Sequence, residues 1–173
     1  MTLSPRTRRL ALTAHVVASV GWLGAITVFL GLAVAGLTVQ DAQKVRGAYL
    51  AMDLTAWSVL VPLAIASLLT GIVQSLGTSW GLFRHYWVLV KLVITVVATV
   101  VLLLYTQTIG SLASIAAEQS ELGELRNPSP VVHAAVALVL LLVTTALAVY
   151  KPRGLTRYGW RKQQQEIRAA ARR

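Results

Sequence analysis

Two histidines and a lysine lie within long apolar stretches of this sequence: His15, Lys91 and His133. An ionisable side chain is costly to bury in such surroundings, so each of the three is a candidate for chemistry. A neutral imidazole is a good axial ligand of haem iron. A lysine at the same depth could pair with a haem propionate, or could ligate the iron if desolvation removed its proton. The leading interpretation is therefore a b-type haem whose iron is bound by His15, with Lys91 beside it.

Three polar stripes at helical spacing predict that these side chains share one interior space. The members of the stripes are His15, Ser19 and Trp22; Ser67, Thr70, Gly71 and Gln74; and Lys91, Thr95, Thr99 and Thr106. The stripes reach the same depth, which predicts an inward-facing polar pocket that also includes Trp22 and Gln74. Small and hydroxylated residues also pack membrane helices together without further function, and that alternative stays open.

The stretch GLFRHYWVLVK places Arg84 and His85 at the entrance to the predicted pocket. His85 could supply a second ligand to the iron, and Arg84 could pair with a propionate or with a lipid phosphate. The alternative for His85 is an interfacial histidine beside two aromatic residues. His133 belongs to the opposite end of the predicted bundle, where Asp53 is its expected partner.

Four apolar segments without Asp, Glu, Lys or Arg must position these side chains. These segments are 10–40, 54–83, 92–117 and 127–150, and each exceeds the roughly 20 residues that a helix needs to cross a bilayer. The predicted spanning cores are 10–36, 54–77, 87–110, which includes Lys91, and 130–150. Of the 173 residues, 56% are hydrophobic and only 13% are charged, whereas soluble domains contain about 25% charged residues. The sequence therefore predicts an all-α integral membrane four-helix bundle over residues 1–150, with a kink expected at Pro62.

The basic residues predict the orientation of this bundle. Thirteen of the sixteen lysines and arginines lie at the N-terminus, in the second connection, at the start of the third span or in the tail at 151–173. By the positive-inside rule both termini are cytoplasmic, which gives a multi-pass protein of the plasma (inner) membrane. The net charge of +10 is therefore ascribed to a basic cytoplasmic tail on anionic lipid, and nucleic acid is not an expected partner.

Two short motifs resemble known families. The segment HVVASVGWLG, which begins at His15, resembles the His-x6-Trp opening of the membrane-bound, haem-containing protoporphyrinogen oxidases and the opening of the copper-resistance D family. HYWVLVKL is similar to the start of the third span of those oxidases, and the resemblance implies His15 as haem ligand and Lys91 as a second functional group. After the first span this chain reads GLAVAGLTVQD, where the oxidases have a basic and aromatic extension.

Over nearly its whole length the chain looks closer to a widespread group of uncharacterised four-helix membrane proteins of actinobacteria. The segment SLLTGIVQSLGTSWGLFRHYWVLVK carries most of this likeness. The resemblance implies the four-helix fold and supplies no activity.

Three classes of function stay open. The first is haem-dependent electron transfer or oxidation of a porphyrin or quinone-type substrate. The second is a non-enzymatic scaffold whose basic tail binds lipid or a partner, and the third is a small transporter or metal-handling protein. The chain has no cysteine, which excludes disulfides and thiolate metal sites. Glycine-rich runs at 21–24 and 31–36 are compatible with close helix contact in a homodimer.

Overall fold

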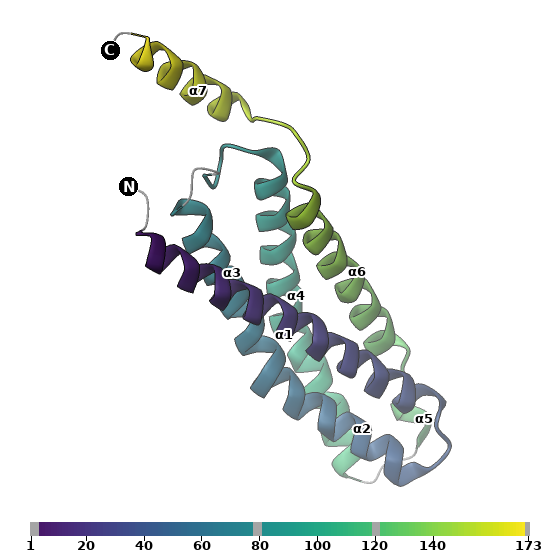
Figure 1. Ribbon diagram of the computed structural model, residues 1–173. Helices are drawn as coiled ribbons and strands as arrows, with labels where there is room; N and C mark the ends of the chain where they lie inside the picture. The colour runs from purple at the N-terminus through teal and green to yellow at the C-terminus, as the bar shows by residue number, and fades with distance from the viewer. Residues whose placement is uncertain (1–3, 78–80, 119–121, 172–173) are drawn as a thin grey trace.

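The protein is almost entirely helical in the computed structural model, which describes residues 4–77, 81–118 and 122–171 (Figure 1). The helices in chain order are α1 (Pro5–Thr38), α2 (Ala42–Thr55), the π-helical turn η1 (Ala56–Leu60), α3 (Val61–Leu76), α4 (Tyr86–Ala117), α5 (Leu122–Leu125), α6 (Ser129–Tyr150) and α7 (Arg157–Ala170). The beginning of α1 and the whole of α7 lie at the same end of the bundle, and α7 extends beyond it (Figure 1).

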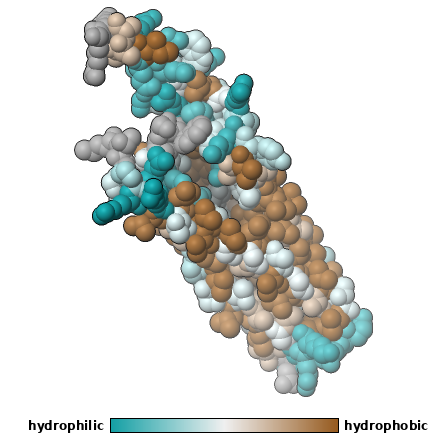
Figure 2. Space-filling model, in the orientation of Figure 1, coloured by the Kyte–Doolittle hydropathy of each residue, from teal (hydrophilic) through white to brown (hydrophobic). Residues whose placement is uncertain are grey.

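Four helical segments are long and apolar enough to cross a membrane: α1, the continuous segment Ala42–Leu76, α4 and α6. Hydrophobic side chains cover the flank of the bundle, and hydrophilic residues gather towards its two ends (Figure 2). The prediction of an all-α protein with four long apolar helices is confirmed. The 34 residues of α1 measure about 50 Å at about 1.5 Å per residue, which exceeds a hydrocarbon core of about 30 Å.

The second membrane-crossing segment extends beyond its predicted spanning core because a polar cap, and not hydrophobicity, sets where it begins. The second membrane-crossing segment starts at Ala42, whereas the predicted core starts at residue 54. Asp41 caps it, since its Oδ1 accepts hydrogen bonds from the backbone N–H groups of Gln43 (2.9 Å) and Lys44 (3.2 Å). The helix thereby includes a polar stretch that a search for apolar residues leaves out.

Pro62 does not interrupt the second segment, because the turn before it is π-helical. A proline inside an α-helix lacks the N–H that would bond to residue i−4, and its ring crowds that carbonyl. The backbone N–H of Val61 bonds instead to the carbonyl of Ala56, five residues back, which is the wider π pattern. The perturbation expected at Pro62 thus takes the form of η1 within a continuous helical segment.

The end of the bundle away from the termini is closed by its own side chains. Tyr49 of α2 is fully buried, and its hydroxyl donates to the carbonyl of Leu125. Arg126 donates to two carbonyls at the C-terminal end of α1, those of Leu37 (2.6 Å) and Val39 (2.6 Å). These bonds satisfy carbonyls that a helix end leaves open, and they tie α1 and α2 to the segment that precedes α6.

Candidate functional site

The polar stripes of α1 and α3 meet, and His15 is at the centre of their contact. The half-buried His15 ring places Nδ1 3.2 Å from the carbonyl oxygen of Ser67 and 3.1 Å from Oγ1 of Thr70. One turn further along, the hydroxyls of Ser19 and Ser67 form a hydrogen bond of 2.8 Å. These bonds confirm the prediction that the first two stripes face each other.

The hydrogen bonds of Thr70 assign the tautomer of His15. The Thr70 hydroxyl donates to the carbonyl of Ala66 at 2.6 Å, so it has no proton to offer the imidazole. Nδ1 of His15 must therefore carry the proton and donate it to Ser67 and Thr70. In the neutral ring Nε2 is then the unprotonated nitrogen, through which His15 could accept a proton or bind a ligand.

The His15 ring is closely packed. A Cβ atom added to Gly71 would lie 3.0 Å from Cε1 of His15, so glycine leaves the room that the ring occupies. Trp22, two turns further along α1, is 3% exposed and belongs to the hydrophobic core. Gln74 is half-buried. Within the described part of the chain, no hydrogen bond joins His15 to Trp22 or Gln74, although the sequence grouped all three in one pocket.

The side chain of Lys91, near the start of α4, is half-buried. No hydrogen bond between this side chain and that of His15 is present among the described residues. The hydroxyl of Thr95 donates to the carbonyl of Lys91 at 2.8 Å, and that of Thr99 donates to the carbonyl of Thr95 at 2.8 Å. Because these hydroxyls bond to their own helix, the alternative of packing without further function fits the third stripe.

The contacts around His15 give no support for a haem at this position. A porphyrin needs open space beside the ring of its iron ligand, and the His15 ring lies against Gly71. A cavity of about 1110 Å³ exists in the structure, but neither His15 nor Lys91 belongs to its lining. Arg84 and His85, the other two predicted haem contacts, do line that cavity. Haem binding at His15 stays a prediction that this packing does not support.

The segment after α6 folds back onto the connection between α3 and α4. Leu155 forms an isolated antiparallel bridge with His85, and the backbone N–H of Thr156 donates to the carbonyl of Arg84 at 3.0 Å. The Thr156 hydroxyl accepts a hydrogen bond of 3.0 Å from the backbone N–H of Gly159, which caps the start of α7. The basic tail is therefore attached to the bundle by its backbone.

Gly159 lets α7 touch the backbone of this connection. A Cβ atom at position 159 would lie 2.2 Å from the carbonyl oxygen of Arg84, a distance that no side chain tolerates. Two turns further along α7, Glu166 holds the Arg84 guanidinium with both carboxylate oxygens, at 2.9 Å for Nη2–Oε2 and 3.3 Å for Nη1–Oε1. Glu166 is the single acidic residue of the tail, and it forms this ion pair.

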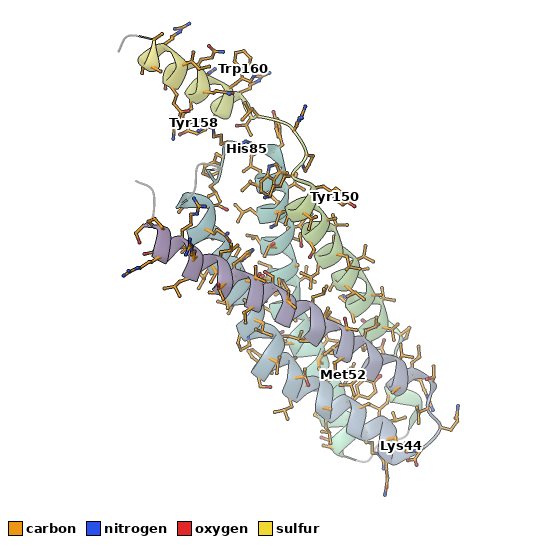
Figure 3. The ribbon with its side chains drawn as sticks, in the orientation of Figure 1. Lys44, Met52, His85, Tyr150, Tyr158 and Trp160 are labelled. Carbon is orange, nitrogen blue, oxygen red and sulfur yellow. The ribbon has the colours of Figure 1, made fainter. Side chains whose placement is uncertain are left out.

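A groove of about 1110 Å³ lies between α7, the segment before it and the start of α4. The charged side chains of its lining are four cations and one acid: Arg84, Lys151, Arg153, Lys162 and Glu166. The aromatic and imidazole side chains of its lining are Phe83, His85, Trp87, Tyr158 and Trp160. His85 directly precedes α4 and lies at the end of the bundle nearest to α7, which carries Tyr158 and Trp160 (Figure 3). This excess of positive charge suits an anion.

Lys151, in the groove, adopts a left-handed backbone conformation with φ 44° and ψ 61° directly after α6. Glycine is the usual residue at such a helix end, and a residue with a side chain is strained there by about 1–2 kcal/mol. Among the described residues other than glycine, Lys151 alone has a positive φ. The left-handed conformation ends α6, and the Lys151 side chain lines the groove.

At the other end of the bundle, the prediction that His133 pairs with Asp53 is wrong. Nδ1 of His133 lies 2.9 Å from the carbonyl oxygen of Ser129, and its ring stacks on Tyr105 with 3.9 Å between the ring centroids. Oδ1 of Asp53 lies 3.6 Å from the position of a Cβ atom on Gly110 of α4. A backbone carbonyl one turn back and a neighbouring ring therefore take the place of the carboxylate.

Sequence reasoning identified Arg84 and His85 but missed Gly159, Glu166 and Lys151 as site residues. It treated the tail as a basic segment on the membrane surface, without a docking place on the bundle. A glycine and a single acid within an otherwise basic helix are the available signal, and its meaning depends on knowing that Arg84 lies opposite.

The chain matches no protein-family model, and no curated protein or solved structure was found to match it. The family resemblances of its short motifs therefore stay predictions. Function follows here from the residues of the site and their geometry.

Proposed function

We propose that this protein is a non-enzymatic membrane protein that binds anionic phospholipid of the cytoplasmic leaflet in the groove beside α7. The observation that carries the proposal is the charge of the groove, whose lining holds four cationic side chains and one acidic side chain around about 1110 Å³. Basic groups near a membrane surface attract anionic lipid by about 1 kcal/mol each. The proposal is the lipid-binding alternative from the sequence, with the binding place between tail and bundle instead of on the tail alone.

The position of the groove suits a lipid headgroup. Its lining includes Leu76, the last residue of α3, and Trp87, the second residue of α4, so it borders the place where one apolar helix ends and another begins. The rings of Trp87, Tyr158 and Trp160 also line it, and such amphipathic rings favour the headgroup depth of a bilayer. The positive-inside rule assigns this end to the cytoplasm, where the leaflet carries anionic lipid.

The remaining alternatives have less support in the geometry. The described ranges contain no group of three or more histidine, aspartate or glutamate side chains that could hold a metal ion. The His15 contact is closely packed and lies outside the lining of the groove. The groove is an open, charged region of the described part of the molecule, and lipid binding is the function that it supports best.

Native mass spectrometry of the detergent-purified protein, with phosphatidylglycerol or phosphatidylcholine added, tests the proposal. We expect phosphatidylglycerol to bind more tightly. The triple variant Lys151→Gln/Arg153→Gln/Lys162→Gln should weaken its binding about 100-fold, since about 1 kcal/mol is lost for each basic residue. Equal binding of the two lipids by the unaltered protein would refute the proposal.

The matched control is the triple variant Arg157→Gln/Arg161→Gln/Arg168→Gln. These three arginines are exposed and do not line the groove, and their spacing of i, i+4 and i+11 places them on one face of α7. The control removes the same charge from the same tail. If it weakened lipid binding as much as the groove variant does, net tail charge would be responsible and the groove would be excluded as the site.

A further inference from the structure

We infer that the groove selects a lipid with a terminal phosphate, a phosphomonoester, and that Arg84 is the residue that recognises this group. The inference rests on the proposed function and goes beyond it, because it names the chemical class of the headgroup. The inference predicts different affinities for two lipids that have the same acyl chain. In one lipid the phosphate is terminal, and in the other it is esterified to a further group.

The ion pair between Arg84 and Glu166 shows how an anion is held at this position. Each of the two guanidinium Nη atoms donates to its own carboxylate oxygen, at 2.9 Å and 3.3 Å. This two-pronged arrangement is the one with which arginine recognises carboxylates and phosphates, and lysine does not reproduce it. The Glu166 carboxylate therefore marks the place that two oxygens of a terminal phosphate would take.

The two members of this ion pair differ in how firmly they are enclosed. The side chain of Arg84 is 18% exposed, whereas that of Glu166 is 52% exposed. The backbone on either side of Arg84 is also bonded to the tail, through Thr156. Arg84 is thus the fixed partner and Glu166 the replaceable one, so a lipid phosphate in the groove competes with Glu166 for the guanidinium.

The charge of the lining favours a terminal phosphate over a phosphodiester. Besides Arg84, the lining contributes Lys151, Arg153 and Lys162, and its acidic side chain is Glu166. A phosphomonoester carries about −1.5 to −2 charges near pH 7 and three acceptor oxygens. A phosphodiester headgroup carries about one negative charge and offers two such oxygens. The monoester can therefore engage Arg84 with two oxygens and a lysine with the third.

The apolar part of the lining indicates that the phosphate belongs to an amphiphile. Leu76, Leu82 and Phe83 line the groove near the ends of α3 and α4, while the lysines and Arg153 come from the tail side. A space of about 1110 Å³ lies slightly above the range of about 300–1,000 Å³ for pockets of small organic ligands and is far larger than an inorganic phosphate needs. A lipid with a terminal phosphate and free phosphate present the same chemical group to Arg84. The acyl chain of the lipid distinguishes the two ligands.

Three probes separate these possibilities: lysophosphatidic acid, lysophosphatidylglycerol of the same acyl chain, and inorganic phosphate. Their binding to the full-length protein in mild detergent is measured by microscale thermophoresis. We expect lysophosphatidic acid to bind about tenfold more tightly than lysophosphatidylglycerol, because it offers more charge and one more oxygen to the cationic lining. Inorganic phosphate should bind more weakly than either lipid.

Two variants test the roles of the ion pair. Arg84→Lys keeps the charge but not the fork, so the preference for lysophosphatidic acid should fall to about threefold or less. Glu166→Gln removes the competing carboxylate, so the affinity for lysophosphatidic acid should rise about threefold or more. Circular dichroism and gel filtration check that each variant is folded, and Glu166→Gln tests the inference if Arg84→Lys is not.

Each outcome gives a decision. Equal binding of the two lysolipids, or tighter binding of lysophosphatidylglycerol, overturns the inference while the proposed function stands. Binding of neither lipid overturns the proposed function and the inference with it. Inorganic phosphate that binds as tightly as lysophosphatidic acid excludes the amphiphile, and a loss of affinity in Glu166→Gln shows that the carboxylate only holds the tail in place.

Discussion

The His15 contact and the groove both collect polar side chains, but they treat them in opposite ways. In the contact, Nδ1 of His15 donates to Ser67 and Thr70 and its ring lies against Gly71. In the groove, four cationic side chains share a lining with one acid around about 1110 Å³. The first region satisfies its polar groups with its own helices, whereas the lining of the second contains more cationic than acidic side chains.

If the proposed function holds, this difference separates the polar residues that specify packing from those that bind lipid. A rare ionisable residue in an apolar span is a functional candidate by default. His15 is the most noticeable of these in the sequence, and yet its Nδ1 atom and one side of its ring are taken up by contacts with α3. Arg84 is less conspicuous beside other interfacial residues, and it lies at the open site. Variants that separate the two regions should therefore affect packing and lipid binding independently.

The largest expected effect is that of Gly159→Ala on the groove. The new Cβ atom would lie 2.2 Å from the carbonyl oxygen of Arg84, so α7 must leave its place and the groove must lose one wall. Binding of phosphatidylglycerol should fall by about 100-fold or more, at least as far as in the triple groove variant. Limited trypsin digestion, which should cut the released tail faster, gives a second measurement.

Gly47→Ala is the matched control for this change, because a Cβ atom at position 47 meets nothing within 4 Å. It should leave both lipid binding and digestion unaltered. Unchanged lipid binding in Gly159→Ala would show that α7 is not a wall of the site. The groove would then no longer be the lipid-binding region that is compared with the His15 contact.

A smaller effect, on stability alone, is expected for the His15 contact. Gly71→Ala forces a Cβ atom to within 3.0 Å of Cε1 of His15 and should lower the free energy of unfolding by about 1–3 kcal/mol. His15→Ala removes two polar contacts between helices and should cost about 1–2 kcal/mol. Thermal unfolding in detergent measures both, and lipid binding should not change.

The double variant His15→Ala/Gly71→Ala sharpens this prediction. Without the imidazole the added methyl group has room, so the double variant should be more stable than the sum of the single losses predicts. Strict additivity would mean that the ring and Gly71 do not depend on each other. Loss of lipid binding in His15→Ala, with the fold intact, would mean that the two regions are coupled.

Lys151→Gly should produce two smaller effects of opposite sign. Glycine adopts the left-handed conformation without strain, so the free energy of unfolding should rise by about 1 kcal/mol. The loss of one cation from the groove should weaken phosphatidylglycerol binding about fivefold. Lys151→Asn, which tolerates this backbone better than most residues, should show the same loss of binding. A variant that gained stability without losing lipid affinity would remove Lys151 from the site.

The smallest expected effect is that of haem supply, which should be none. The packing of the His15 ring against Gly71 predicts that protein purified after growth with added haem shows no Soret absorption band. A band that is present in the unaltered protein and absent in His15→Ala would show that α1 and α3 separate to admit a porphyrin. The first region would then be the functional one.

The sequence predicts the four long helices well because hydrophobicity alone determines which segments can cross a membrane. It also predicts that His15 faces the stripe of Ser67 and Thr70, since spacing of three and four residues defines a helix face. Helix ends are less predictable from apolar content. The start of α2 depends on the cap at Asp41, which belongs to a polar stretch.

The groove could not be predicted, because it depends on contacts between residues far apart in the chain. Gly159 and Arg84 are 75 positions apart in the sequence, and the glycine acquires a meaning when α7 is placed on the connection after α3. The partner of His133 was mispredicted for a related reason. A backbone carbonyl one turn away, at Ser129, was available without any contribution from a distant carboxylate.

The π-helical turn η1 also corrects the phase of the second membrane-crossing segment. Buried positions recur along this segment at Tyr49, Met52, Ala56, Leu60, Ala64 and Ser67. In a regular α-helix each step of four residues turns the face by about 40° beyond a full revolution. Three consecutive steps of four would therefore carry the buried face about 120° around the helix.

The wider turn absorbs about one residue, or about 100° of this rotation, so one buried face continues from α2 into α3. His15 consequently owes its partners to a backbone irregularity some ten residues away from them. If Pro62 were replaced and η1 closed into a regular helix, Ser67 and Thr70 would turn away from α1. Deleting one residue from η1 at the same time would bring them back.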